Sequence, residues 1–117
     1  MRKIEEMELL RKKQNAYMMK IETLLFSESS PFKNEIYKFF YISQFGESLE
    51  IYVFYKNNKV LLNNHQNGTT DNIKAFIFEK LNESDYFKEF SKNLLFVFDS
   101  DENVKEKYKG NYFLRLR

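Results

Sequence analysis

The sequence predicts an α+β fold: one domain over residues 1–117, with a long N-terminal helix and a largely antiparallel sheet, in the order α-β-β-β-α-β-(α)-β. Three patterns predict it. Apolar residues recur at three- and four-residue steps over residues 3–26, they alternate between two faces over residues 49–55, and the helical period returns over residues 73–81. A chain of 117 residues is long enough for one hydrophobic core and too short for two domains.

The N-terminal helix is predicted over residues 3–26. Its apolar stripe consists of Ile4, Met7, Leu10, Tyr17, Met18, Ile21, Leu24 and Leu25. Arg11 and Gln14 interrupt the stripe, so we expect the second half to pack on the domain, while residues 1–13 can project from it or contact a partner. The face over residues 4–25 suits either packing on the chain's own sheet or pairing with a second chain as a homodimer.

The first strand is expected over residues 36–44, where aromatic and β-branched side chains are concentrated, beyond Pro31, which ends the helix. A short helix over residues 32–40 fits the same apolar side chains and is the alternative. The chain is then expected to turn near Gly46. The second strand places Leu49, Ile51, Val53 and Tyr55 on one face and Tyr52 and Phe54 on the other.

The stretch YKNNKVLLNNHQNG, from Tyr55 to Gly68, is predicted to hold a hairpin turn and then a loop. A two-residue turn at Asn57–Asn58 would pair Tyr55 with Val60, and asparagine tolerates the left-handed conformation that such a turn needs. The rest, NNHQNG, is expected to be a loop that leads to the next helix. It contains His65, the only imidazole of the chain. Because no carboxylate is near it in sequence, we expect a surface histidine and not a catalytic one.

The second half of the chain is predicted to contain a helix capped by Thr69 or Thr70, a short helical segment capped by Ser84, and a strand. The apolar side chains expected to face the core are Ile73, Phe76, Ile77, Leu81, Phe87 and Phe90. Residues 94–98 form an uninterrupted apolar run, which predicts a fully buried strand.

The C-terminal region is predicted to form a short helix and a last edge strand. Ser100 is expected to cap the helix, acidic residues occupy its first turn, and Gly110 lies beyond its end. The edge strand is expected to carry Tyr112, Leu114 and Leu116 on one face, with Arg115 and Arg117 on the other.

Composition narrows the class of function. The chain has 31% charged residues and a net charge of +2, far from the strong positive charge of a dedicated nucleic-acid binder. No apolar run exceeds five residues, so we expect no contact with a membrane, and the lack of cysteine excludes thiol chemistry and suits the cytoplasm. Its abundant Phe, Tyr, Asn, Ile and Lys have AT-rich codons, which indicates a low-GC bacterium or its phage. Such a bias can by itself produce 18% aromatic residues.

The sequence predicts no catalytic residue, no cofactor and no metal. The segment DSDEN, Asp99–Asn103, has the alternating oxygen ligands of a calcium loop, but Val104 and Gly110 stand where that loop needs glycine and glutamate. We expect these acids to stabilise the N-terminus of the following helix, with a looser magnesium site as the alternative. The three glycines are isolated, so the sequence has no phosphate-binding glycine loop.

The predicted order of elements resembles that of a double-stranded RNA-binding domain, which implies a lysine cluster at the start of the last helix. The corresponding helix opens with TTDNIK, which has an acid in place of the lysines. The order also invites comparison with restriction nucleases, whose adjacent strands carry an aspartate and then Glu-x-Lys. Here Glu50 is followed two positions later by Tyr52. We therefore assign the chain to neither family.

We expect a small non-enzymatic binding or regulatory protein that docks onto a protein partner. An inhibitor of a bacterial defence nuclease, encoded by a phage or mobile element, or an immunity-type protein is the most concrete form of this expectation. The alternative is a nucleic-acid-binding module that uses the basic and aromatic residues near the C-terminus. The candidate partner-binding residues are Arg11, Lys12, Lys13, Tyr108, Tyr112, Arg115 and Arg117.

Overall fold

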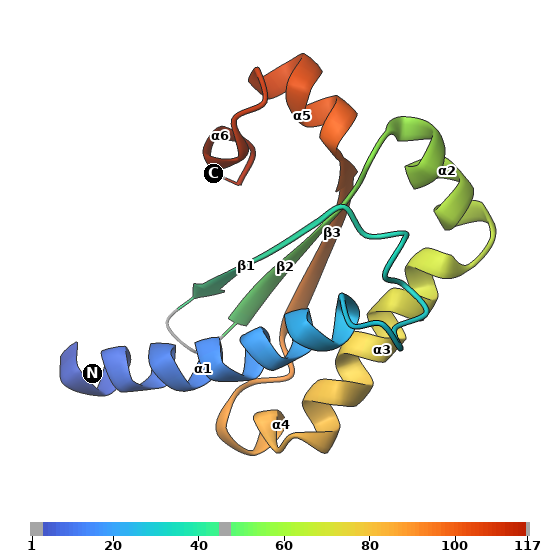
Figure 1. The fold of residues 1–117 in the computed structure, drawn as a ribbon. Helices are drawn as coiled ribbons and strands as arrows, with labels where there is room; N and C mark the ends of the chain where they lie inside the picture. The colour runs from blue at the N-terminus through green and yellow to red at the C-terminus, as the bar shows by residue number, and fades with distance from the viewer. Residues whose placement is uncertain (1–3, 45–47, 117) are drawn as a thin grey trace.

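A three-stranded sheet lies between two sets of helices in the structure, a computed structural model that describes residues 4–44 and 48–116 (Figure 1). In chain order the elements are α1 (Ile4–Leu25), β1 (Lys38–Gln44), β2 (Ser48–Tyr55), α2 (Asn58–Gln66), α3 (Thr69–Glu83), α4 (Tyr86–Glu89), β3 (Leu94–Ser100), α5 (Asp101–Tyr108) and α6 (Tyr112–Arg115). The α+β fold and the long N-terminal helix are thus confirmed.

The sheet is mixed, with the strand order β1-β2-β3. β1 runs antiparallel to β2, as predicted, whereas β3 runs parallel to β2. The parallel pair follows from the long connection through α2, α3 and α4, because parallel strands need a crossover of a dozen residues or more.

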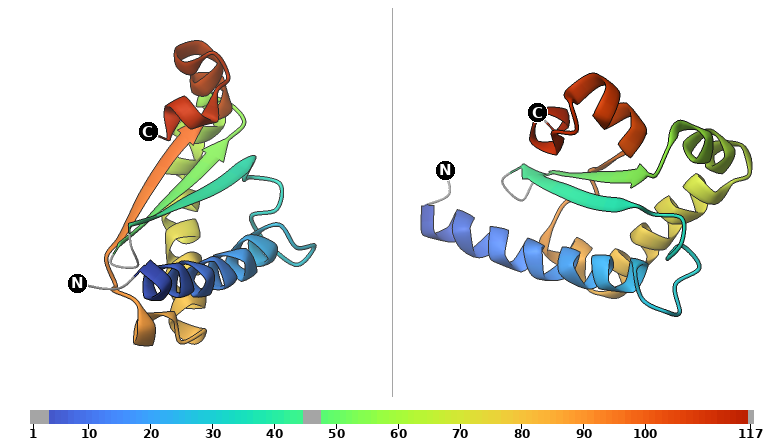
Figure 2. Two further views of the ribbon diagram at one scale, coloured as in Figure 1. Left: turned by 90° about the vertical axis from the view of Figure 1, so that its left-hand side faces the viewer. Right: turned by 45° about the horizontal axis from the view of Figure 1, so that its top comes forward.

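The predicted alternation of β2 is confirmed, and it builds two cores. Leu49, Ile51, Val53 and Tyr55 are fully buried in the first core, where the sheet packs on α1 and α3. α1 contributes Met18, Ile21 and Leu25 to this core, and α3 contributes Ile73, Ile77 and Leu81. Tyr52 and Phe54 point to the opposite face, where they form the second core with Val104 of α5. Figure 2 shows α5 and α6 on the side of the sheet opposite α1 and α3.

α1 is buried only in its second half. Gln14 is its first buried residue, and the N-terminal end of the helix extends beyond the ends of the strands (Figures 1 and 2). Although Gln14 interrupts the apolar stripe, its Nε2 donates a hydrogen bond of 2.8 Å to the hydroxyl of Tyr86, which is also buried. The interruption therefore joins α1 to α4 instead of marking an exposed site.

The predicted hairpin turn at Asn57–Asn58 is wrong, because residues 58–66 form α2. The side chain of Asn57 caps this helix and accepts a hydrogen bond of 2.9 Å from the backbone of Val60. Asparagine favours helix N-caps as much as turns, so the same pair of residues fits both structures. The predicted loop NNHQNG is accordingly wrong over its first four residues, which end the helix.

The predicted C-terminal edge strand is also wrong, because residues 112–115 form α6. Asn111 caps this short helix and accepts a hydrogen bond of 3.2 Å from the backbone of Leu114. Tyr112 and Leu116 both pack on the second core. Residues four apart share a helix face, and the same two residues also satisfy the period of a strand.

Smaller differences concern caps and burial. Gly68, with φ of 86°, precedes α3 in place of a threonine cap, and Ser84 ends that helix instead of starting the next. The prediction that residues 94–98 are fully buried is wrong, because one face of β3 is open: Leu95 is 55% exposed. The strand predicted over residues 36–44 begins at Lys38, and the turn predicted near Gly46 lies outside the described residues.

Candidate functional site

The carboxyl ends of β2 and β3 meet at one edge of the sheet, where α2 and α5 begin. Open sheets with parallel strands commonly bind ligands at this edge. A cleft of about 440 Å³ lies here, and its lining is mostly charged and polar: Tyr37, Lys56, Asn57, Asp101, Glu102, Lys105 and Glu106. This edge is therefore a candidate ligand-binding site.

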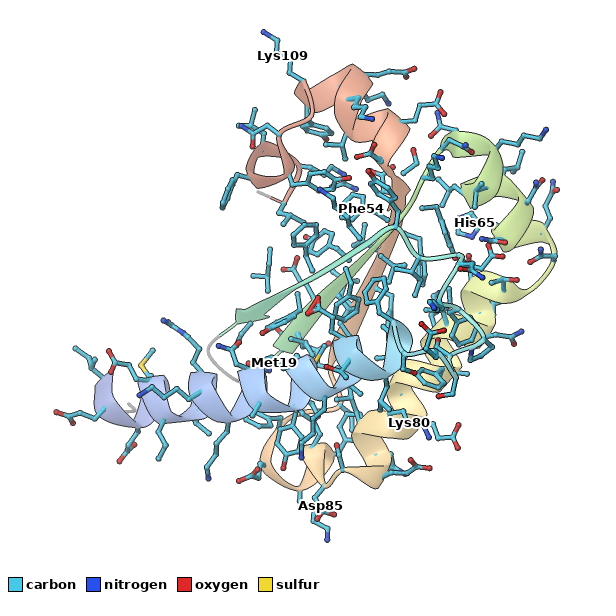
Figure 3. The ribbon with its side chains drawn as sticks, in the orientation of Figure 1. Met19, Phe54, His65, Lys80, Asp85 and Lys109 are labelled. Carbon is cyan, nitrogen blue, oxygen red and sulfur yellow. The ribbon has the colours of Figure 1, made fainter. Side chains whose placement is uncertain are left out.

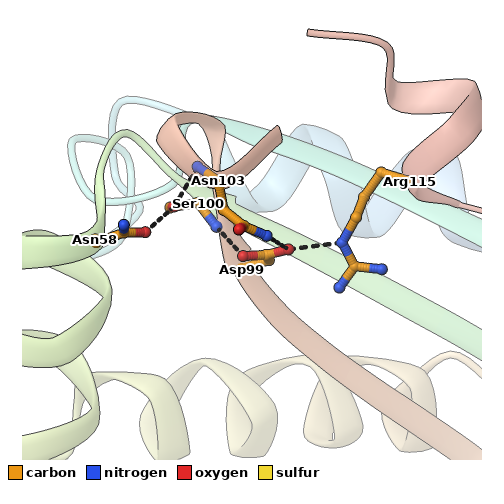
Figure 4. A network of polar contacts seen from close by, with 5 residues as sticks. All are labelled: Asn58, Asp99, Ser100, Asn103 and Arg115. Atoms are coloured by element: carbon orange, nitrogen blue, oxygen red, sulfur yellow. Dashed lines mark hydrogen bonds and ion pairs between the residues drawn. The ribbon is translucent and has the colours of Figure 1, made fainter. Parts of the chain in front are cut away.

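A network of polar contacts ties the two helix starts together (Figure 4). Ser100 caps α5, as predicted, and accepts a hydrogen bond of 3.0 Å from the backbone of Asn103. Its hydroxyl also donates to the side-chain oxygen of Asn58, the first residue of α2. Glu102 adds a second link, because its carboxylate accepts a hydrogen bond of 3.0 Å from the backbone of Asn58. The first turns of α2 and α5 are thus capped partly by each other.

Asp99 is bound on both carboxylate oxygens. Oδ1 accepts a hydrogen bond of 2.8 Å from the backbone of Ser100. Oδ2 accepts one of 2.8 Å from the side chain of Asn103 and one of 2.6 Å from Nε of Arg115, which also forms an ion pair with it (Figure 4). Arg115 belongs to α6, so this ion pair fastens the C-terminal helix to the end of β3.

Asp101 makes the matching contact from the first turn of α5. It accepts a hydrogen bond of 2.5 Å from the hydroxyl of Tyr112 and pairs with Nζ of Lys105 at 3.0 Å. Burial by itself would raise the pKa of Asp101, but the hydrogen bonds from Tyr112 and Lys105 outweigh it and lower this pKa. Burial and the bound carboxylate raise the pKa of Tyr112 well above its usual value. Asp101 is thus charged and Tyr112 neutral at ordinary pH.

The acids of DSDEN therefore serve the N-terminus of α5, where Asp101 and Glu102 occupy the first turn. Asp99 and Asp101 are both engaged by side chains of α6. Within residues 4–44 and 48–116, no group of three or more His, Asp or Glu side chains lies close enough to hold a metal ion.

The aromatic residues proposed for partner binding near the C-terminus lie against the sheet. The ring of Tyr112 meets that of Phe54 edge-on at 4.9 Å and that of Phe40 at 5.3 Å. Nζ of Lys38 lies 4.5 Å from the centre of the Tyr112 ring. Tyr108 packs on the second core, and the guanidinium of Arg115 lies 5.8 Å from its ring. Arg117, the last candidate, lies outside the described residues.

Different side chains of the C-terminal region face solvent. Phe113 is 88% exposed and Leu114 is 44% exposed, both on α6. Lys107 and Lys109 are exposed at the end of α5, and Figure 3 shows Lys109 pointing away from the protein. Phe113 is not among the partner-binding residues proposed from the sequence, although the alternation of the predicted strand puts it on the same face as Arg115 and Arg117.

The structure does not bring the two groups of candidate residues together. Arg11, Lys12 and Lys13 lie on α1, whereas Tyr108, Tyr112 and Arg115 lie on the opposite side of the sheet (Figure 1). Nζ of Lys13 pairs with the carboxylate of Glu89 on α4 at 3.0 Å. Arg11 and Lys12 are exposed. No single surface of one chain can therefore contain both groups of candidate residues.

His65 lies on the exposed side of α2, labelled in Figure 3. Its ring meets the ring of Phe98 edge-on, with 6.3 Å between the ring centres. The exposed position agrees with the surface histidine that the sequence predicts, although the residue belongs to a helix and not to a loop.

Comparison with known proteins gives no relative. No family model matches the chain, and neither a curated protein nor a solved structure is detectably similar to it. Among the described residues, no helix is both long and apolar enough to cross a membrane.

Proposed function

We propose that this protein is a non-enzymatic binding protein that docks onto a protein partner through the exposed side of α6. The observation that carries the proposal is Phe113, which is 88% exposed on a helix that is itself fastened to the sheet. Aromatic side chains that insert into a partner's pocket supply much of the affinity of protein interfaces. An inhibitor or immunity-type protein of a phage or mobile element is the form of this function that we favour.

The anchoring of α6 supports docking because it holds Phe113 ready. Arg115 and Tyr112 bind Asp99 and Asp101, and Asn111 caps the helix. A partner that binds a prearranged side chain does not have to order it first, which saves conformational entropy. Lys107 and Lys109 are exposed just before α6, so we expect the partner to present an apolar pocket with an acidic rim.

The test is capture of partners by the immobilised protein from an extract of the organism that carries the gene. We compare the wild type, Phe113→Ser and the matched control Leu62→Ser, which changes an equally apolar residue, 56% exposed, on α2. The proposal expects a protein that the wild type and Leu62→Ser retain and that Phe113→Ser retains at least tenfold less. Equal capture by all three would exclude α6 as the docking surface.

Nucleic-acid binding is the alternative. The packing of Tyr108 and Tyr112 on the second core argues against it, and Phe113 is the aromatic ring of this region that remains open for stacking. Base stacking needs open aromatic faces, whereas Tyr112 packs between Phe54, Phe40 and Lys38. Titration of labelled single-stranded DNA, duplex DNA and RNA at low and near-physiological salt tests it. Binding that weakens steeply with salt and is lost in Lys107→Glu/Lys109→Glu would replace the protein-docking proposal.

A further inference from the structure

A second surface of the molecule, on α1, has the pattern of a helix-pairing seam. The positions on the helix side opposite the first core are Glu5, Leu9, Lys12, Ala16, Met19 and Thr23. They are spaced alternately by four and three residues, which is the spacing of the two seam positions of a coiled coil. All six are exposed.

The seam has exposed apolar side chains and an adjacent groove that is also largely apolar. Leu9 is 56% exposed and Met19 is 63% exposed, ten residues apart on the same side of the helix. A shallow groove of about 360 Å³ lies beside Met19 and is lined by Met19, Lys20, Thr23 and Leu24. An exposed leucine on one part of a helix and a groove on another part suit a symmetric pair, in which each copy fills the groove of the other.

We propose that the occupant of this face is a second copy of the same chain, with its α1 antiparallel to the first and the twofold axis near residue 14. This register sets Leu9 of each copy against Met19 of the other. It also sets Lys12 against Ala16 and Glu5 against Thr23. Moving the register by one heptad in either direction leaves Leu9 opposite Lys12 or opposite no seam residue, so the register is defined by the apolar pair.

The charges at the seam positions favour the antiparallel direction. A parallel pair would stack Glu5 on Glu5 and Lys12 on Lys12 along the seam, and like charges that meet across an interface destabilise it. In the antiparallel pair, Lys12 meets the small side chain of Ala16, so its stem can lie along the seam while its ammonium reaches water.

The flanking charges add one attraction and one repulsion in each half of the pair. Glu6 of each copy lies near Lys20 of the other, which is favourable. Glu8 lies near Glu22, which is unfavourable. In addition, the Lys13 side chains of the two copies meet near the twofold axis, which is unfavourable, although each is paired with Glu89 of its own chain. We therefore expect a weak dimer that dissociates on dilution. This surface is separate from Phe113, so the self-association and the proposed docking function can each fail without the other.

Disulfide cross-linking tests the pair, because the chain contains no cysteine of its own. We mix chains that carry Leu9→Cys with tagged chains that carry Met19→Cys and oxidise them. The register brings these positions together, whereas two copies of position 9 lie about 15 Å apart along the helix, at 1.5 Å per residue. The proposal expects a 9–19 cross-link at least tenfold above that of the matched control, Ile4→Cys mixed with Met19→Cys.

A charge exchange tests the direction by a second route. Sedimentation should show a weaker dimer for Glu6→Lys and for Lys20→Glu, and recovery in the double variant Glu6→Lys/Lys20→Glu. A cross-link between two Leu9→Cys chains would show a parallel pair and overturn the proposal. So would a 9–19 cross-link no stronger than the control, or a monomer at all concentrations. All of the changed side chains are exposed, so the fold itself should tolerate them.

Discussion

The two faces of the same sheet are held in different ways. On the face toward α1 and α3, the described residues include fifteen buried members of the first core, whereas the second core has three, Tyr52, Phe54 and Val104. The smaller core is supplemented by polar anchors, chiefly the pair of Asp99 and Arg115 and the hydrogen bond between Asp101 and Tyr112.

The difference indicates that the two sides of the sheet unfold at different free energies. Buried apolar area dominates the first core, so it should unfold only with the whole domain. The contacts of α5 and α6 are fewer and depend on a few polar groups, so these helices should open locally at lower free energy. The position of the proposed docking residue, Phe113, thus depends on the polar anchors of α6 and not on the first core.

The largest effect is expected from a truncation in the first core. Ile51 is fully buried in β2, and Ile51→Ala should reduce the free energy of unfolding by about 2–5 kcal/mol, because it leaves a cavity in a packed core. Urea unfolding followed by circular dichroism measures it. Leu62→Ala is the control, with a loss below about 0.5–1 kcal/mol, since that side chain is 56% exposed. Similar losses in both variants would refute the importance of the first core.

A smaller effect is expected from Arg115→Ala, which removes the anchor of α6. The pair is partly buried, with 21% and 11% of the two side chains exposed, so we expect a loss of about 1–2 kcal/mol. The loss should appear as local opening of α5 and α6. If instead urea unfolded this variant as easily as Ile51→Ala, the two faces would not differ as we describe. Arg11→Ala, on the exposed part of α1, should change little.

Part of this organisation could be predicted from the sequence and part could not. The alternation of β2 and the buried stripe of α3 were readable, because burial imposes the period of each element. Asn57–Asn58 and Tyr112–Leu116 were misread because their residues fit two structures equally, and long-range contacts decide between them. Glu102 on Asn58 and Asp101 on Tyr112 are such contacts, and a local pattern does not contain them.

Local patterns in the sequence were also insufficient to predict which surface residues are free to bind a partner. Helical periodicity identified the buried side of α1 and left its other side unexamined, although Leu9 and Met19 are apolar residues off the buried stripe. Arg115 and Tyr112 were proposed as contacts with a partner because they are polar and aromatic, but their partners are Asp99 and Asp101 in the same chain. A charge in the sequence does not reveal whether its counterpart is internal.

The smallest effect concerns pH and one side chain. Asp101→Asn should lower the pKa of Tyr112 toward that of a free tyrosine without reaching it, since burial, the largest cause of the shift, remains. Spectrophotometric titration between pH 9 and 13 measures the change, with Tyr112→Phe to assign the signal. Tyr52, whose pKa burial and Glu50 raise to about 12, should stay unchanged and serves as the internal control. An unaltered Tyr112 titration would contradict its hydrogen bond to Asp101.

The effect of pH on stability follows from the protonation state that the fold favours at Tyr112 and at Asp101. The raised pKa of Tyr112 stabilises the fold fully below about pH 10, and this contribution is lost as pH rises through the folded pKa. The lowered pKa of Asp101 stabilises the fold above its ordinary value of 3.8, and this contribution is lost as pH falls through the folded pKa. The anchors of α6 should therefore weaken at both extremes of pH.

Native-state hydrogen exchange, read by mass spectrometry, tests most directly whether the two faces differ. The account predicts strong protection of residues 49–55 and 73–81 and clearly weaker protection of residues 101–116, lowered further by Arg115→Ala while the first two segments stay protected. Equal protection of all three segments, lost together in Arg115→Ala, would contradict it: the C-terminal helices would then be part of one cooperative core.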